Sequence, residues 1–102
     1  MIRVLSLIPN TIEEKKRDQI MEKMIHAMQQ AKGLNSLYIN EGHIMSPGGP
    51  PPYAKVVEAS FDSLEDFMDW VQTPAAQADK EQMLRNGVVS IFYEVKKVIN
   101  RS

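Results

Sequence analysis

Apolar residues recur along this chain with two spacings, which together predict four strands and two helical regions. Short runs rich in Val, Ile and Leu are typical of strands, and they cover residues 2–8, 34–43, 53–61 and 88–99. After the first run, apolar residues return every three or four positions as far as Ala31, which is the spacing of one helix face. The same spacing returns between residues 62 and 85. The resulting order, β-α-β-β-α-β, predicts an α+β, ferredoxin-like fold with a four-stranded antiparallel sheet.

Capping residues predict where the helices begin and end. We expect Thr11 to cap the first helix, with Glu13 and Glu14 in its first turn. Lys32-Gly33 then stops this helix, because glycine tolerates the left-handed backbone that often follows a helix. The second helical region has three such signals: Asp62 as a cap with Glu65 three residues later, Thr73-Pro74 as a restart, and Asn86-Gly87 as the end.

The segment Met45–Pro52 predicts a loop between the second and third strands. It contains Ser-Pro-Gly-Gly-Pro-Pro-Pro, in which three consecutive prolines lack the backbone N–H that a helix or a central strand needs. Two glycines in the same segment favour turns.

Sorting the strand residues by odd and even number predicts which sheet face meets the helices. The odd set is almost wholly apolar, and we expect it to contact the helices: Leu5, Leu7, Leu37, Ile39, Val57, Ala59, Phe61, Val89, Ile91 and Tyr93. The even set is mixed, yet too apolar for a face in water. We therefore expect a homodimer with sheet against sheet, and the residues predicted at its interface are Val4, Tyr38, Val56, Glu58 and Phe92.

Composition narrows the class of protein. The chain has 102 residues, a net charge of −1 and no cysteine, which fits a single cytoplasmic domain over residues 1–102. It has no basic run of the kind that binds nucleic acid, and no apolar stretch approaches the ~20 residues of a membrane span. With two histidines, His26 and His43, we expect no metal site, and we expect no cofactor.

Three motifs resemble the EthD family, which is named for ethyl tert-butyl ether degradation. They are Asn40-Glu41-Gly42, the Gly/Pro loop that ends in Pro-Tyr at Tyr53, and Phe61-Asp62-Ser63-Leu64-Glu65. The resemblance covers nearly the whole chain and implies a dimeric α/β barrel built from two ferredoxin-like halves. It implies no single reaction, because similar folds serve as monooxygenases, cyclases, lactone isomerases and proteins of unknown role.

One family feature is missing from the first helix. Family members often carry a His-Met-Pro-like element whose histidine faces the cleft. Here the only histidine of the helix, His26, is not followed by proline and falls opposite the Met/Ile face on a helical wheel. We expect His26 to point to solvent, so the family histidine's chemistry does not transfer to it.

Four residues are candidates for ligand binding: His43, Tyr53, Tyr93 and Trp70. His43 and Tyr53 bracket the proline loop and share a strand parity, so we expect them to flank one opening. His43 fits either a general base or a strand-end residue bonded to the loop backbone. Tyr53 fits either a hydrogen-bond donor to a ligand or an aromatic ring packed under the loop.

The other two candidates are aromatic residues with structural alternatives. Tyr93 is expected in the core, with a hydroxyl that needs a partner. Trp70 lies about a quarter turn off the apolar face of its helix, which predicts a dimer contact or a lid over the proline loop. Glu58 is a charged residue within the even-numbered face. We expect its carboxylate either to form an ion pair across the dimer interface or to lie at the solvent-exposed edge of that interface.

These observations lead to three hypotheses for function. The first is a small EthD-like protein that binds an apolar small molecule in a cleft between helices and sheet, accessory to degradation or biosynthesis. The second is a cofactor-independent monooxygenase, cyclase or isomerase of the same fold, although no catalytic residue can be named. The third is a structural dimerisation module.

Overall fold

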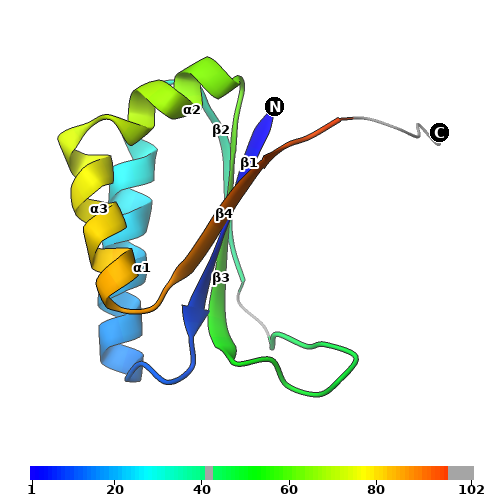
Figure 1. The fold of residues 1–102 in the computed structure, drawn as a ribbon. Helices are drawn as coiled ribbons and strands as arrows, with labels where there is room; N and C mark the ends of the chain where they lie inside the picture. Colours follow the sequence, from blue (N-terminus) through cyan, green and yellow to red (C-terminus); the bar gives the residue numbers. More distant parts are fainter. Residues whose placement is uncertain (41–42, 97–102) are drawn as a thin grey trace.

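A four-stranded antiparallel sheet carries all three helices on one of its faces (Figure 1). The computed structural model describes residues 1–40 and 43–96. Its elements are β1 (Ile2–Pro9), α1 (Glu14–Gln29), β2 (Leu34–Ile39), β3 (Tyr53–Phe61), α2 (Leu64–Val71), α3 (Pro74–Arg85) and β4 (Val89–Glu94). The strand order is β2-β3-β1-β4. The α+β, ferredoxin-like fold predicted from the sequence is confirmed, and none of the helices in the described ranges is long and apolar enough to cross a membrane.

Two strands are shorter than predicted. β2 ends at Ile39 rather than His43. At Asn40 the backbone N–H still donates to the Val56 carbonyl at 3.1 Å, but the Val56 N–H donates to the Asn40 side chain at 2.6 Å and not to its backbone carbonyl. β4 ends at Glu94 rather than Ile99, and residues 97–99 lie outside the described ranges. The proline loop contains neither helix nor strand, as predicted.

The helix caps confirm some predictions and correct others. Helix α1 begins at Glu14 with Glu13 at the N-cap, so Thr11 is not its cap. The cap of α2 is Ser63, whose hydroxyl accepts from the Asp66 N–H, while Asp62 accepts instead from the Asn35 amide at 2.9 Å. Thr73 caps α3, and Asn86-Gly87 ends it with Gly87 at φ +72°.

The assignment of sheet faces is wrong for β1 and β4. Strand pairing places Val4 opposite both Ala59 of β3 and Phe92 of β4, and directly paired residues of antiparallel strands share a face. The helix-covered face therefore carries even-numbered residues of β1 and β4 but odd-numbered residues of β3. From β2 it carries Leu37 and, across a register shift between Leu34 and Ser36, also Leu34. Odd or even numbering does not mark the same sheet face in all four strands, because each pair of strands has its own register.

The core is built around an aromatic cluster between β3 and α2. The ring of Phe61, fully buried, lies 5.3 Å from Phe67 and 5.6 Å from Trp70 between ring centroids. The Trp70 indole N–H donates to the Ala27 carbonyl at 3.0 Å, one of the last carbonyls of α1, which have no partner within the helix. Trp70 is thus a core residue, and its predicted place at a dimer contact or lid is wrong.

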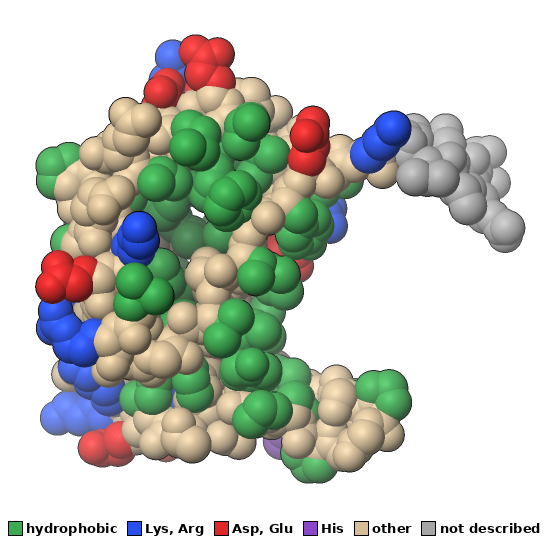
Figure 2. All heavy atoms as spheres, in the orientation of Figure 1, with side chains coloured by type: hydrophobic (Ala, Val, Ile, Leu, Met, Phe, Trp, Pro, Cys, Tyr) green, Lys and Arg blue, Asp and Glu red, His purple; other side chains and the backbone are tan. Residues whose placement is uncertain are grey.

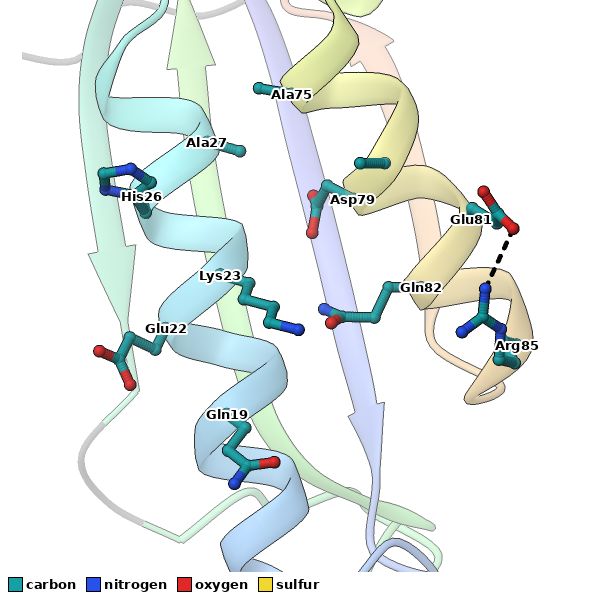
Figure 3. A pocket seen from close by; sticks show the side chains of 11 residues that line it. Gln19, Glu22, Lys23, His26, Ala27, Ala75, Asp79, Glu81, Gln82 and Arg85 are labelled. Atoms are coloured by element: carbon teal, nitrogen blue, oxygen red, sulfur yellow. Dashed lines mark hydrogen bonds and ion pairs between the residues drawn. The ribbon is translucent and has the colours of Figure 1, made fainter.

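Helices α1 and α3 pack side by side over the sheet and enclose a buried carboxylate. Asp79 of α3 is only 5% exposed and points toward α1 (Figure 3). Neither of its oxygens has a hydrogen-bond partner among the described residues, and burial raises its pKa from 3.8 to about 6. A groove of about 950 Å³ runs over it between the two helices, lined among others by Lys23, His26 and Gln82.

This raised pKa predicts that Asp79 weakens the fold at neutral pH. Well below pH 3.8 the carboxyl is neutral in both the folded and unfolded chains, and the penalty is absent. As the pH rises through 6 the folded protein must hold a poorly solvated charge, so stability falls. We expect Asp79→Asn to raise the free energy of unfolding at pH 7 by about 1–2 kcal/mol, a figure reduced for screening by water in the groove.

Urea denaturation at pH 7 and at pH 4 measures this effect. The gain in the free energy of unfolding from Asp79→Asn should be present at pH 7 and much smaller at pH 4, close to the ordinary pKa of 3.8. The exposed Asp69 of α2 supplies the matched control, since Asp69→Asn should change stability little at either pH. An equal gain at both pH values would contradict the charge-burial explanation.

Candidate functional site

A cavity of about 240 Å³ lies between the helices and the sheet. Its wall combines aliphatic, aromatic and polar side chains from five elements: Val4, Met28, Phe67, Trp70, Val71, Ala76, Gln77, Lys80, Met83, Ser90 and Phe92. In the space-filling view, hydrophobic side chains surround a hollow between the helices and β4 (Figure 2). The cavity lies between helices and sheet, as the predicted cleft does, but its wall does not include His43 or Tyr53, which were expected to flank the opening of that cleft.

The cavity opens because the helical layer does not close over β4. Every residue of β4 is exposed on at least part of its side chain, and Phe92 remains 56% exposed although it faces the helices. The Phe92 ring still reaches Phe67 of α2, with 4.8 Å between centroids. Phe92 therefore forms one edge of the opening instead of filling the space.

A break between α2 and α3 shapes the other side of the opening. Thr73 donates its hydroxyl to the Trp70 carbonyl at 2.7 Å and accepts from the Ala76 N–H at 3.2 Å. It thus ends one helix and starts the next, and Pro74 at the first helical position fits because the N–H there needs no helical partner. Residues from both sides of this break, Val71 and Ala76, line the cavity.

Three polar side chains join the apolar wall: Gln77, Lys80 and Ser90. The Ser90 and Ser6 hydroxyls share a hydrogen bond of 3.0 Å across β4 and β1, which explains how Ser6 can be fully buried. The Gln77 amide donates to the Val71 carbonyl at 2.6 Å. Ion pairs among the described residues join Arg3 to Glu58 and Arg85 to Glu81, and neither involves Lys80.

The structure separates the four predicted ligand-binding residues. Trp70 lines the cavity as part of its buried wall. Tyr93 is 42% exposed and pairs with Arg3 on the outer face, so its predicted place in the core is wrong. His43 is exposed beyond the end of β2, and Tyr53 is half-buried at the start of β3. Neither lines the cavity, and an opening that they share near the loop stays a prediction.

Two residues predicted at the dimer interface belong to the cavity instead. Val4 is 4% exposed within the core, and Phe92 faces α2, because of the register of β1 and β4. Tyr38, Val56 and Glu58 do lie on the outer face, where Tyr38 pairs with Glu58 in the sheet. Glu58 contacts Arg3 of its own chain at 3.5 Å.

His26 is exposed, as predicted from the helical wheel. Its Nε2 lies 3.0 Å from the Gln30 amide on the same helix, and its ring turns away from α3 (Figure 3). It borders the groove between α1 and α3 but not the cavity above the sheet. Within residues 1–40 and 43–96, no group of three or more His, Cys, Asp or Glu residues is arranged to hold a metal ion.

Comparison with known proteins identifies the fold through solved structures. No family model matches the sequence, and no curated protein matches it significantly. An EthD family protein from Bacillus halodurans superposes with a TM-score of 0.74 at 16% identity, over 94% of this chain and 99% of the other. A hydroxynitrile lyase from Passiflora edulis gives 0.75 at 16% identity, over 97% and 96%. A dimeric ferredoxin-like protein of unknown function from Thermobifida fusca gives 0.69 at 15% identity, over 92% and 90%.

At these identities the likeness concerns the fold and not the activity. The similar structures share one architecture and differ in their described roles, among them a lyase and a putative antibiotic biosynthesis monooxygenase from Deinococcus radiodurans. The chain therefore has the ferredoxin-like fold of EthD-type and related dimeric proteins.

Proposed function

We propose that this protein binds an apolar small molecule in the cavity between its helices and its sheet. The observation that carries the proposal is the open, largely apolar cavity itself, walled by Phe67, Trp70 and Phe92. Ligand sites in proteins are concave and mostly apolar, with a few polar groups that set orientation. Gln77, Lys80 and Ser90 supply such groups here.

The size of the cavity limits the ligand. An apolar cavity of about 150 Å³ in another protein binds benzene, so about 240 Å³ suits one ring with a short side chain. The cavity also opens beside Phe92, which allows part of a ligand to remain outside. A neutral probe of suitable size is 3-phenylpropan-1-ol.

Binding of this probe can be followed through Trp70, the only tryptophan of the chain and part of the cavity wall. We expect saturable changes in its emission as 3-phenylpropan-1-ol is added. We also expect Phe92→Ala to weaken binding about five-fold, because one aromatic contact is worth roughly 1 kcal/mol. Stability should change little, since Phe92 is 56% exposed.

The matched control is Met68→Ala on α2. Met68 is also an exposed apolar residue, at 42%, but it does not line the cavity, so the affinity for the probe should be unchanged. The absence of any saturable response in the wild-type protein, by fluorescence and by calorimetry, would contradict the proposed function.

We further propose that two copies of the chain pair through the outer faces of their sheets. Several residues of β4 and β2 on this face are exposed and apolar: Tyr38 at 65%, Val89 at 42%, Ile91 at 50% and Tyr93 at 42%. Leu5, Leu7 and Val56, half-buried, extend the same face across β1 and β3. Contiguous apolar surface of this kind is typical of interfaces, and similar structures include proteins described as dimeric.

The shape of the chain suits such a partner. In Figure 1 the loop before β3 and the end of β4 both extend away from the helices, beyond the outer face of the sheet. Figure 2 shows hydrophobic side chains along β4 between these two projections. The outer sheet of a second copy, related by a twofold axis, would cover this face between them.

Placing a charge in this face should separate the copies. We expect the wild-type protein to scatter light as a dimer, and Ile91→Glu to give a mass near the 11.6 kDa of one chain, because a buried unpaired carboxylate is costly. The control is Leu84→Glu on α3, where an apolar residue 69% exposed lies away from the sheet. A monomeric wild-type protein, or a dimer that survives Ile91→Glu, would overturn the proposed interface.

A further inference from the structure

We infer that the cavity selects an apolar molecule that carries an acidic group, and that Lys80 of α3 binds this group. The inference rests on the proposed function and adds the class of ligand. It depends on the distribution of charge and of hydrogen-bond donors around the wall of the cavity.

Lys80 belongs to the cavity side of its helix. Ala76, Lys80 and Met83 follow one another at spacings of four and three along α3, so their side chains leave the helix on one face. Ala76 is buried and Met83 is partly buried against the core, and all three line the cavity. A lysine placed between two core contacts lays its methylene stem along apolar surface and keeps its ammonium group toward water.

The cavity wall carries a positive charge, and no acidic side chain of the wall neutralises it. Among the described lining residues there is no aspartate or glutamate, and Lys80 is the only one that carries a charge. The ion pairs found in the described ranges lie elsewhere, on the outer face of the sheet and at the end of α3. A carboxylate on a bound ligand would therefore provide the ammonium group of Lys80 with an ion-pair partner.

The other polar wall residues are also able to donate. Ser6 and Ser90 share one hydrogen bond in which either hydroxyl can donate, and when the buried Ser6 is the donor, Ser90 keeps its own hydrogen for an acceptor in the cavity. The Gln77 amide uses one N–H for the Val71 carbonyl and retains a second. A carboxylate accepts hydrogen bonds only, so these donors complement it, whereas an ammonium group would meet Lys80 with like charge.

A matched series of ligands tests the inference. The probes are 3-phenylpropanoate, 3-phenylpropan-1-ol and 3-phenylpropylamine, which share one apolar body and differ in the terminal group. Dissociation constants are measured at pH 7 and low salt by calorimetry and by Trp70 emission. We expect the carboxylate to bind about ten-fold more tightly than the alcohol, in the range of a charge-assisted hydrogen bond, and the amine to bind most weakly.

Variants of Lys80 separate charge from packing. Lys80→Met keeps the apolar stem and should remove the preference for the acid, while the affinity for the alcohol changes less than two-fold. Lys80→Arg should retain the preference. Lys15→Met, at an exposed position of α1 outside the cavity, makes the same change in net charge and should leave all three affinities unchanged. Circular dichroism checks that each variant is folded.

The outcomes distinguish the two proposals. If the alcohol and the acid bind equally in the wild-type protein, or if Lys80→Met leaves the preference intact, the role of Lys80 is overturned while the proposed apolar site stands. If the amine binds best, the assigned charge preference is wrong. If none of the three probes binds, the proposed function itself fails. A tighter acid whose advantage disappears only in Lys80→Met supports the inference.

Discussion

The hydrogen bond from the Trp70 indole to the Ala27 carbonyl joins the parts of the structure on which the cavity depends. It ties α2 to the last turn of α1 at a distance of 3.0 Å, while the indole ring packs on Phe61 of β3. One side chain thus satisfies a helix-end carbonyl, fills the core and forms part of the cavity wall. Because an unpaired buried carbonyl is costly, the position of α2 over the sheet is strongly constrained.

The same constraint leaves β4 poorly covered. Because α2 is held against β3 and α1, its ring contact with β4 is the one between Phe67 and Phe92. The other residues of β4 have exposed side chains. The sheet therefore has two apolar surfaces that the chain itself does not cover. One is the cavity on the helix side, and the other is the outer face with Tyr38, Ile91 and Tyr93.

The sequence predicts the order of elements well and the faces of the strands poorly. Periodicity, turns and the Thr73-Pro74 restart are local signals, and they identified each strand and helix found in residues 1–40 and 43–96. The face of a strand depends on its register with its neighbours, which is a long-range property. In β1 both alternating sets are apolar apart from Arg3 and Ser6. Arg3 marks the outer face, whereas Ser6 is buried on the helix side with its hydroxyl bonded to Ser90.

The candidate site shows the same limit. Trp70 stood out because of its residue type, but its burial depends on Phe61 and on the Ala27 carbonyl, both distant in sequence. Lys80 and Gln77 look like ordinary solvent-facing residues of a helix, and no local pattern distinguishes them. Their place at the cavity follows from how α3 lies against the sheet, which the sequence pattern alone does not give.

Strand β4 connects the two uncovered surfaces. Phe92 faces the cavity, whereas its neighbours Ile91 and Tyr93 face the outer side, because successive residues of a strand alternate. A partner that covers the outer face would restrict the motion of β4 and so fix the edge of the cavity that Phe92 forms. By linkage, a ligand that orders Phe92 would favour the same arrangement of the outer face. Under the two proposals together, pairing of the chains and occupation of the cavity should therefore strengthen each other through this single edge strand.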